Sequence, residues 1–390
     1  MSWTNVTVGD AFDFVRNGKS IKQSKEVDGL PITRIETIAD RIVDPARVGY
    51  AGLNEAGNEQ WLLRNGDILF SHINSVDHIG KCAIYEGVPE KLLHGMNLLA
   101  LRPGRLLHPK FAYYALSHDR FRARLLPFVN KAVNQASVST TNLKTLEIPL
   151  PHLAEQKRIA AILDKADQLR QKRRQAIALL DSLTQSIFLE MFGDPVSNPK
   201  GWQWSKLGEI GNLDRGVSKH RPRNDPRLLG GAHPLIQTGD VSNSSGYIRA
   251  FRSTYSDLGL SQSKMWPAGT LCITIAANIA STGILTFPAC FPDSVVGFSS
   301  SRPGMSQYVR VWMSFLKKTL ETIAPAVAQK NINLAILREL DIPLPSAESL
   351  RKFNLAMDQL AIEQEKSRLQ KQNSGVLFAS LQHRAFSGQL

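Results

Sequence analysis

The sequence has few cysteines and no long apolar run, and both absences narrow the classes of protein that fit it. Its three cysteines, Cys82, Cys272 and Cys290, are scattered and form no CxxC pair. This argues against a disulfide framework or a zinc module and fits a reducing cytoplasm. No apolar stretch approaches the roughly 18 residues that span a bilayer, and the first residues lack the basic-then-apolar pattern of a signal peptide. We therefore expect a cytoplasmic protein without a membrane partner.

Catalytic and cofactor motifs are also absent. Residues 17–20 resemble the Gly-Lys-Ser end of a P-loop, but Asp13 stands where that motif needs its first glycine. There is no GxGxxG, HExxH or GxSxG, and no Asn-Pro-Pro-aromatic cluster of an amino-methyltransferase. The histidines have no metal-ligand spacing, and the Pro-Asp pair that ends at Asp293 lacks the acid-x-Lys of a nuclease site. We expect no catalytic residue, metal or cofactor in this chain, and hence a recognition function.

Positive charge is what the sequence has in excess. Its 390 residues include 47 lysines and arginines against 34 aspartates and glutamates, a formal net charge of +13. The basic residues lie throughout the chain rather than in a terminal tail. An excess of this size indicates a polyanionic partner, with nucleic acid as the first candidate. The alternative, that the charge serves solubility alone, stays open at this point.

The second half of the chain repeats the first. Residues 148–151 and 342–345 both read Ile-Pro-Leu-Pro, 194 positions apart. The same offset continues without a gap and aligns Phe192 with Phe386. A chance tetrapeptide would not keep one register over such a span, and the period is far longer than that of a solenoid repeat. We interpret the chain as a tandem duplication.

Each half predicts a globular α+β domain followed by a long helix. Trp3 and Trp202 open similar segments in the two halves, and residues 66–72 and 269–276 read as buried strands after a glycine turn. Short strands between Gly, Pro and Asn turns, with a few amphipathic helices, are typical of α+β domains. We predict globular domains over residues 1–151 and 193–345, and long helices over residues 152–192 and 346–390.

The first long helix carries the seam of a coiled coil. Its apolar residues recur in alternating steps of three and four, from Ile159 and Ile162 to Leu183 and Ile187. One helix over residues 153–190 would be about 57 Å long. The second helix is less regular, and two such helices most simply bury their seams against each other. The alternative, in which each helix packs on its own globular domain, remains open.

Several of these segments resemble the specificity subunits of type I restriction–modification systems. Residues 135–164, "QASVSTTNLKTLEIPLPHLAEQKRIAAILD", are similar to the end of a target recognition domain and the start of its spacer helix. The tryptophan openings, the Gly-Asp-Ile-Leu strand and the closing "LTQSIF" are similar too, and the resemblance covers essentially the whole chain. The second copy has Ser349-Leu350 where the first has Glu155-Gln156, which leaves open how alike the two helix starts are.

The resemblance implies a non-catalytic DNA-recognition subunit. Two target recognition domains in tandem pseudo-repeat would each read one half of a bipartite double-stranded DNA site. The two long helices, packed as an antiparallel coiled coil, would fix the distance between the halves. Two methyltransferase subunits would dock on the helices and methylate flipped adenines with S-adenosylmethionine that they hold themselves. Restriction and motor subunits would join for cleavage, in the cytoplasm of a bacterium or archaeon.

Residues that contact DNA are expected in loops, because phosphates bind Lys and Arg, and base edges favour Arg, Lys, Asn, Gln and His. In the first domain the candidates are Arg16, Lys19, Lys22, Lys25, Arg34, His72, Asn74 and Lys81. In the second domain they are Arg215, Lys219, His220, Arg221, Arg223, Gln237, Asn278, Lys330 and Asn331. The loop from Arg215 to Arg223 is the stronger candidate because five cationic or potentially cationic groups lie within nine residues. A solvated loop without a ligand is the alternative for each.

Two other functions remain open from the sequence. In the first alternative, the chain is the recognition half of a fused methyltransferase or endonuclease. The absence of cofactor motifs argues against this alternative. In the second it is a basic coiled-coil scaffold, which predicts DNA binding without sequence preference.

Overall fold

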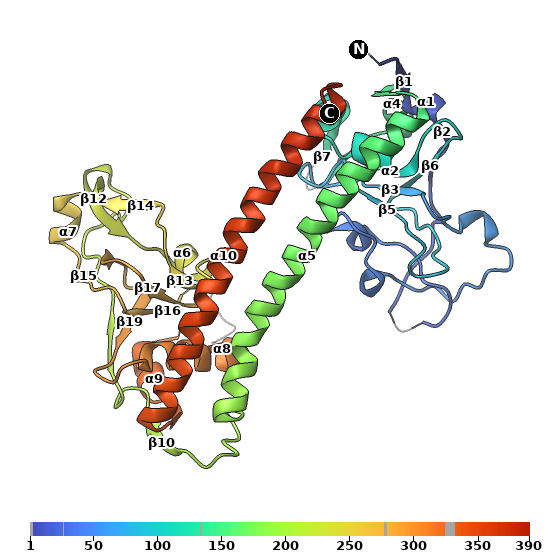
Figure 1. The fold of residues 1–390 in the computed structure, drawn as a ribbon. Coiled ribbons are helices and arrows are strands. Elements are labelled where there is room, and N and C mark those ends of the chain that lie inside the picture. The colour runs from blue at the N-terminus through green and yellow to red at the C-terminus, as the bar shows by residue number, and fades with distance from the viewer. Residues whose placement is uncertain (1–2, 26, 133–134, 277–278, 324–331) are drawn as a thin grey trace. The chain divides into compact units, whose positions relative to one another are not determined.

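The computed structural model (Figure 1) describes residues 3–390 except 26, 133–134, 277–278 and 324–331. The chain divides into two compact units. Unit 1 comprises Met1–Arg174 and Gln370–Leu390, and unit 2 comprises Gln175–Leu369. Each unit therefore contains a globular domain and parts of both long helices. Within the described part of the chain, no helix is long and apolar enough to cross a membrane.

The described residues of unit 1 form three small antiparallel sheets. Their strand orders are β2-β6-β3-β5, β4-β8-β7 and β1-β9. The strands are β1 (Asn5–Thr7), β2 (Phe12–Asn17), β3 (Ile68–Phe70), β4 (Ile73–Asn74), β5 (Cys82–Ile84), β6 (Leu99–Pro103), β7 (Asn130–Ala132), β8 (Gln135–Ser137) and β9 (Glu147–Pro149). The helices of the domain are α1 (Val8–Ala11), η1 (Ile35–Ile38), η2 (Pro45–Arg47), η3 (Glu59–Trp61), α2 (Pro109–Leu116), α3 (Asp119–Leu125), η4 (Leu126–Phe128) and α4 (Thr140–Thr145).

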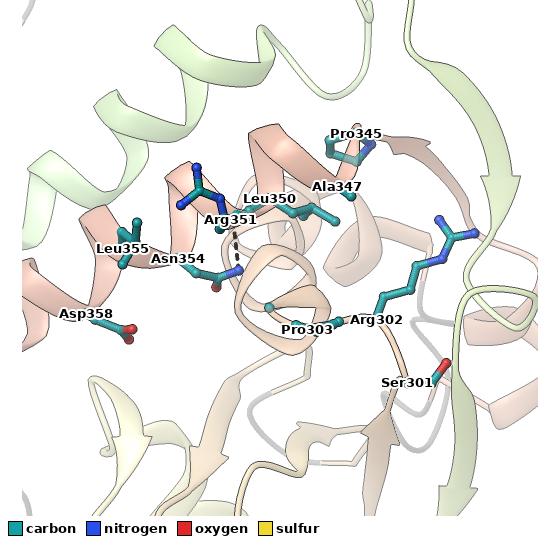
Figure 2. Close-up of a pocket in the computed structure, with 11 residues that line it drawn as sticks. Ser301, Arg302, Pro303, Pro345, Ala347, Leu350, Arg351, Asn354, Leu355 and Asp358 are labelled. Atoms are coloured by element: carbon teal, nitrogen blue, oxygen red, sulfur yellow. Dashed lines mark hydrogen bonds between the residues drawn. The ribbon is translucent and has the colours of Figure 1, made fainter.

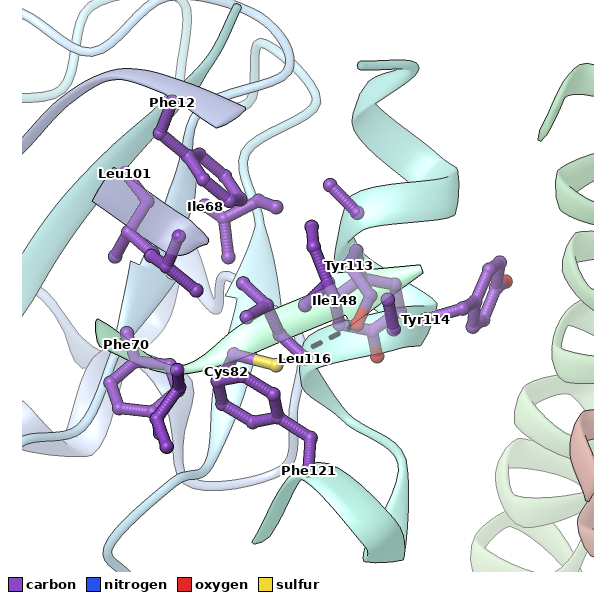
Figure 3. Packing of buried hydrophobic residues seen from close by; sticks show 14 of the residues in the cluster. Phe12, Ile68, Phe70, Cys82, Leu101, Tyr113, Tyr114, Leu116, Phe121 and Ile148 are labelled. Carbon is purple, nitrogen blue, oxygen red and sulfur yellow. Dashed lines mark hydrogen bonds between the residues drawn. The ribbon is translucent and has the colours of Figure 1, made fainter. Parts of the chain in front are cut away.

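The core of unit 1 lies between the four-stranded sheet and helices α2 and α3 (Figure 3). Ile68 and Phe70, two residues apart on β3, project from the same face of the sheet. The ring of Phe70 meets the ring of Phe121 on α3 edge to face, with 6.5 Å between their centroids. Cys82 is buried in the same cluster, and burial raises the pKa of its thiol to about 12. This cysteine is therefore a core residue and not a nucleophile.

Unit 2 is built on a five-stranded sheet of order β11-β19-β16-β17-β13, with further sheets β14-β12-β18-β15 and β10-β20. The strands are β10 (Gln203–Lys206), β11 (Asn212–Arg215), β12 (Leu229–Leu235), β13 (Gly246–Ile248), β14 (Ser253–Tyr255), β15 (Met265–Trp266), β16 (Leu271–Thr274), β17 (Thr282–Leu285), β18 (Ala289–Cys290), β19 (Val295–Ser299) and β20 (Asp341–Leu344). The helices of the domain are η5 (Pro226–Leu228), α6 (Thr238–Ser242), α7 (Asp257–Ser261), α8 (Met305–Ile323) and α9 (Leu334–Arg338).

The two Ile-Pro-Leu-Pro segments form equivalent strands. In unit 1, β9 pairs antiparallel with β1, and Ile148 lies opposite Val6. In unit 2, β20 pairs antiparallel with β10, and Ile342 lies opposite Ser205. Among the residues that the structure describes, both sheets have two strands, so each proline has an open side where its missing N–H costs nothing. The segment thus joins the end of each domain to its beginning, just before the long helix starts.

The long helices α5 (Leu153–Phe192) and α10 (Ala347–Phe386) both contain 40 residues. Their first residues are 194 positions apart, and so are their last, which is the offset of the sequence repeat. The expected α+β class with two long helices is confirmed.

In unit 1 the two helices lie side by side. Arg158 donates to the carbonyl oxygen of Leu390 (2.8 Å), and Arg173 donates to that of Gln370 (2.9 Å). Between them, the guanidinium of Arg170 lies 4.2 Å from the centre of the Phe378 ring. Residue numbers rise along α5 while those of the partners fall, so the helices are antiparallel here.

Unit 2 repeats this arrangement with the other helical segments. Gln364 on α10 donates to the carbonyl oxygen of Leu180 (3.3 Å) and to the carboxylate of Asp181 on α5 (3.0 Å). Nearer the ends, the rings of Phe188 and Phe353 are 5.9 Å apart. Phe188 also stacks on Tyr308 of α8, so both long helices pack on the globular domain of this unit. Packing of a helix on its own domain alone is therefore not what the structure shows.

The sequence difference between the two helix starts has a structural cause. Gln156 is buried, accepts from the N–H of His108 (2.8 Å) and donates to the carbonyl oxygens of Leu106 (3.0 Å) and Pro151 (2.8 Å). Leu350, the equivalent residue of α10, packs instead in the apolar core of unit 2 beside Phe353. The first helix is thus fixed to its domain by an amide, and the second by apolar packing.

Exchanging these two residues should destabilise the unit that receives the wrong one. Gln156→Leu leaves three main-chain groups without their partner, and Leu350→Gln buries an amide in an apolar core. Each change should lower the free energy of unfolding by about 2–4 kcal/mol. Chemical denaturation with hydrogen exchange resolved by peptide measures the loss in each unit. The exposed Lys157→Leu is the matched control, and an equal loss for all three variants would contradict the assigned roles.

Candidate nucleic-acid interface

Most of the candidate cations of unit 1 are held by other parts of the domain. Arg16, on β2, donates to the carbonyl oxygen of Gln60, and its guanidinium lies 4.4 Å from the centre of the Phe14 ring. Its partial burial, with the nearby Arg102, lowers the pKa of Arg16 from its ordinary value. Lys19 donates to Oδ1 of Asn58 (2.6 Å). These contacts favour a structural role for both side chains.

Further candidates of unit 1 are engaged more loosely. Arg34 pairs with Glu36 (3.2 Å), Lys81 donates to the carbonyl oxygen of Ala39 (3.3 Å), and Asn74 accepts from the N–H of Ser75 (2.7 Å). Lys22 and Lys25 are exposed on the loop that follows β2. The two lysines are therefore the side chains of this loop with most access to a ligand.

His72 is buried rather than presented to solvent. Its side chain is 4% exposed, and desolvation lowers its pKa to about 4. His94, 1% exposed, has its pKa lowered to about 4 for the same main reason, although its Nε2 lies 2.9 Å from the carbonyl oxygen of Leu98. In this conformation His72 offers no ring edge to DNA. Both histidines belong to the core of unit 1.

Acid should therefore destabilise unit 1 before carboxylate protonation begins. Both rings are neutral in the folded state, whereas the unfolded chain binds their protons near pH 6.5. The two neutral histidines therefore contribute their whole share of the free energy of unfolding above pH 6.5. This contribution falls as the pH drops toward 4, by about 1.4 kcal/mol per pH unit for each histidine. Urea denaturation at several pH values, with peptide-resolved hydrogen exchange, measures the slope. His72→Asn should reduce the slope in unit 1, and the exposed His152→Asn should not. Equal slopes for both variants would contradict this account.

In unit 2 the loop after β11 is fixed by several contacts. The N–H of Gly216 donates to the carbonyl oxygen of Val295 (2.8 Å), and a side chain at Gly216 would collide with the main chain of Phe291. Gln262 accepts from the N–H of His220 (3.0 Å), and the hydroxyl of Ser263 donates to the carbonyl oxygen of Val217 (2.7 Å). The loop therefore holds its cations in a defined place.

Two carboxylates partly neutralise this loop. Asp225 lies 2.7 Å from a guanidinium nitrogen of Arg227 and 3.1 Å from Nε2 of His220. Hydrogen bonds from Arg227 hold the pKa of the Asp225 carboxyl well below its usual range. Asp293, from another loop, pairs with both Arg221 and Arg223. Sequence reasoning missed Arg227, Asp225 and Asp293 as parts of this surface, although Asp225 and Arg227 follow Arg223 by only two and four residues.

Gln237 and Arg34 occupy matching positions in the two units. Arg34 immediately precedes η1, and its N–H donates to Oγ1 of Thr37 (2.8 Å). Gln237 immediately precedes α6, and its N–H donates to Oδ2 of Asp240 (2.9 Å). In both cases a side chain three residues on caps the short helix. The duplicated fold thus presents different polar side chains at the same place.

The remaining candidates are two exposed cations and three residues outside the described part of the chain. Arg215, the last residue of β11, and Lys219, on the loop after it, are exposed. Asn278, Lys330 and Asn331 lie outside the described residues. The structure tests none of these assignments, and all of them stay predictions.

A hollow lies at the start of each long helix. In unit 2, between residues 301–304 and the first turns of α10, it has a volume of about 720 Å³ (Figure 2). Leu350, Leu355 and Pro303 line it, and Asn354 donates to the carbonyl oxygen of Leu350 (2.8 Å). In unit 1 a hollow of about 870 Å³ lies at the start of α5. Across the described residues, no group of three His, Cys, Asp or Glu side chains is arranged to hold a metal ion.

Comparison with known proteins identifies the class. The family model of the type I restriction modification DNA specificity domain matches residues 1–179 and 199–371, and the chain belongs to this family. The chain is 32% identical to the "Putative type I restriction enzyme MjaX specificity subunit" of Methanocaldococcus jannaschii, over 96% of this chain and 92% of that protein. It is 22% identical to the EcoBI specificity subunit of Escherichia coli, over 100% of this chain and 86% of that one.

Solved structures share the fold. The type I restriction–modification S subunit from M. genitalium has a TM-score of 0.63 at 15% identity, with 99% of this chain and 96% of that chain covered. A chain from a study of complex assembly and conformational transition of the type I R-M system has a TM-score of 0.53 at 17% identity, with 100% and 98% covered. At these identities the likeness concerns the fold alone.

Proposed function

We propose that this chain is the DNA sequence-specificity subunit of a type I restriction–modification system. Its two α+β domains would act as target recognition domains, over residues 1–151 and 193–345, each reading one half of a bipartite site in double-stranded DNA. The observation that carries the proposal is the repeated order of globular domain and long helix. Each domain is closed by an Ile-Pro-Leu-Pro strand and followed by a 40-residue helix, at one offset. Two related recognition domains on one chain suit a DNA site with two halves.

The helices, over residues 152–192 and 346–390, would act as the spacer between the two target recognition domains. A 40-residue helix is about 60 Å long, which exceeds the roughly 34 Å of one turn of DNA. The antiparallel contacts within each unit support packing of the two helices as a coiled coil. Such a pair would be stiff enough to hold two recognition domains at a set distance on a duplex.

Exposed apolar residues on the helices support docking of partner subunits. In unit 2, Leu355, Ile362 and Leu369 recur every seven residues on α10 and are exposed, as are Leu179 and Leu183 on α5. Apolar side chains in a row on one helix are typical of a protein–protein interface. We infer that two methyltransferase subunits dock on the helices, one per repeat, and that restriction and motor subunits join them.

Catalysis would belong to those partners. The methyltransferase subunits would hold S-adenosylmethionine and methylate adenines, and the specificity subunit would position them on the site. The proposed location is the cytoplasm of a bacterium or archaeon.

The purified chain tests this division of roles directly. Alone it should bind duplex DNA, but it should neither bind S-adenosylmethionine nor transfer a methyl group. Calorimetry and a radiolabelled methyl-transfer assay, repeated with the methyltransferase subunit added, give the answer. Methylation by the chain alone would favour a fused methyltransferase, and DNA binding without any sequence preference in the full complex would favour a scaffold.

A further inference from the structure

Asp293 holds two arginines of the loop that follows β11. It lies in the turn between β18 and β19, seventy residues from Arg223. One of its carboxylate oxygens accepts from the guanidinium of Arg223 (2.5 Å), and the other lies 3.6 Å from the guanidinium of Arg221. The side chains of Arg221, Arg223 and Asp293 are 55%, 45% and 37% exposed. The cluster is therefore open to solvent and to any ligand that reaches this loop.

Two guanidinium groups that converge on one anion form a site suited to a phosphate. Arginine presents its donors in a rigid fork that matches carboxylate and phosphate oxygens alike. The carboxylate of Asp293 occupies the position that a phosphate group would take between Arg221 and Arg223. Ion pairs this exposed are worth little, so a phosphate of DNA can replace the carboxylate.

The main chain of the loop keeps Arg221 in place for such an exchange. The loop begins at Gly216, which packs against the main chain of Phe291 and Pro292, directly before Asp293. Arg221 also donates to the carbonyl oxygens of Ser218 (2.6 Å) and His220 (2.8 Å). Because the loop packs on the segment that carries Asp293, Arg221 is already held in place when a phosphate arrives, and the Arg223 side chain only has to exchange the carboxylate for the phosphate.

We propose that Arg221 and Arg223 form a phosphate clamp for the DNA backbone, and that Asp293 occupies this clamp in the free protein and must be displaced by DNA. The inference rests on the proposed function and adds to it a residue that opposes binding. Asp293 thereby lowers the affinity of the second domain for any duplex, since every phosphate that enters the clamp competes with it. Removing the carboxylate should open the clamp to DNA.

Asp293→Asn tests the clamp in the full chain. Its affinity for a random-sequence duplex, measured by fluorescence anisotropy at low salt, should rise about three- to tenfold, because up to two weak ion pairs no longer compete. The gain should shrink as salt is added. Asp257→Asn is the matched control: Asp257 is fully exposed in the same domain, its removal changes the net charge equally, and its partner is His233.

The phosphate clamp and the proposed function would be contradicted by different results. A gain no larger than that of Asp257→Asn, or a loss of affinity, overturns the clamp. A gain that persists when Arg221 and Arg223 are both replaced by alanine overturns it too, because the carboxylate then has nothing to block. Asp293→Ser repeats the test if the asparagine variant fails to fold. If the unaltered chain binds no duplex DNA, the proposed function itself fails.

Discussion

Replacing Arg221 and Arg223 together with alanine should weaken recognition of one half-site by about 100-fold and leave the other half-site unchanged. Both side chains leave the same fixed loop of unit 2, so their loss removes contacts of one domain only. If both bind phosphates, the slope of log affinity against log salt should fall by about two. Binding to duplexes in which one half-site at a time is scrambled, measured over a range of salt, gives both quantities.

The reciprocal variant supplies the control. Lys22 and Lys25 lie exposed on the loop after β2 of unit 1, and replacing both with alanine removes the same charge. That change should weaken recognition of the other half-site. Equal loss at both half-sites for either double variant would contradict modular reading by two domains.

Lengthening the spacer should change the preferred gap between the half-sites without changing the half-sites themselves. Four residues inserted after Lys172 add about 6 Å to α5, which corresponds to about two base pairs of DNA. Arg173 of α5 bonds to Gln370 of α10, so an insertion in α5 alone would break their register. The design therefore also inserts four residues before Gln370. Selection from a library of half-sites with variable gaps measures the new preference.

Two further designs sharpen this test. The insertion in α5 alone should reduce binding at every gap, because the helices can no longer pair along their length. A matched substitution of four exposed residues, without an insertion, should leave the gap unchanged. A change in half-site sequence after the paired insertion would contradict the assignment of spacing to the helices and reading to the domains.

The sequence predicted the repeated plan well because the plan depends on local patterns. Apolar positions spaced alternately three and four residues apart predict α5. The apolar seam of α10 is less regular, and the constant offset of the repeat predicts that helix instead. The sequence showed the Ile-Pro-Leu-Pro segments only as a repeat, and the structure shows that they are strands paired with β1 and β10. That pairing joins residues about 140 positions apart (Val6 and Ile148), and no local pattern contains it.

The candidate interface was less predictable because contacts between distant segments decide it. A count of cations marks the loop from Arg215 to Arg223, but it does not show that Asp293 neutralises part of it. Residue type alone selects His72 as a DNA contact, whereas its burial depends on the fold around β3. The deviation at Leu350 has an evident reason only once Gln156 is seen to bond three main-chain groups of unit 1.

Mapping the adenines methylated in DNA, when this chain is produced together with its methyltransferase subunit, tests the central claim most directly. The account predicts one bipartite motif, two short defined sequences separated by a fixed gap, and less methylation of that same motif when Arg221 and Arg223 are replaced, because phosphate contacts carry no sequence information. A single uninterrupted motif, or methylation without any motif, would contradict it.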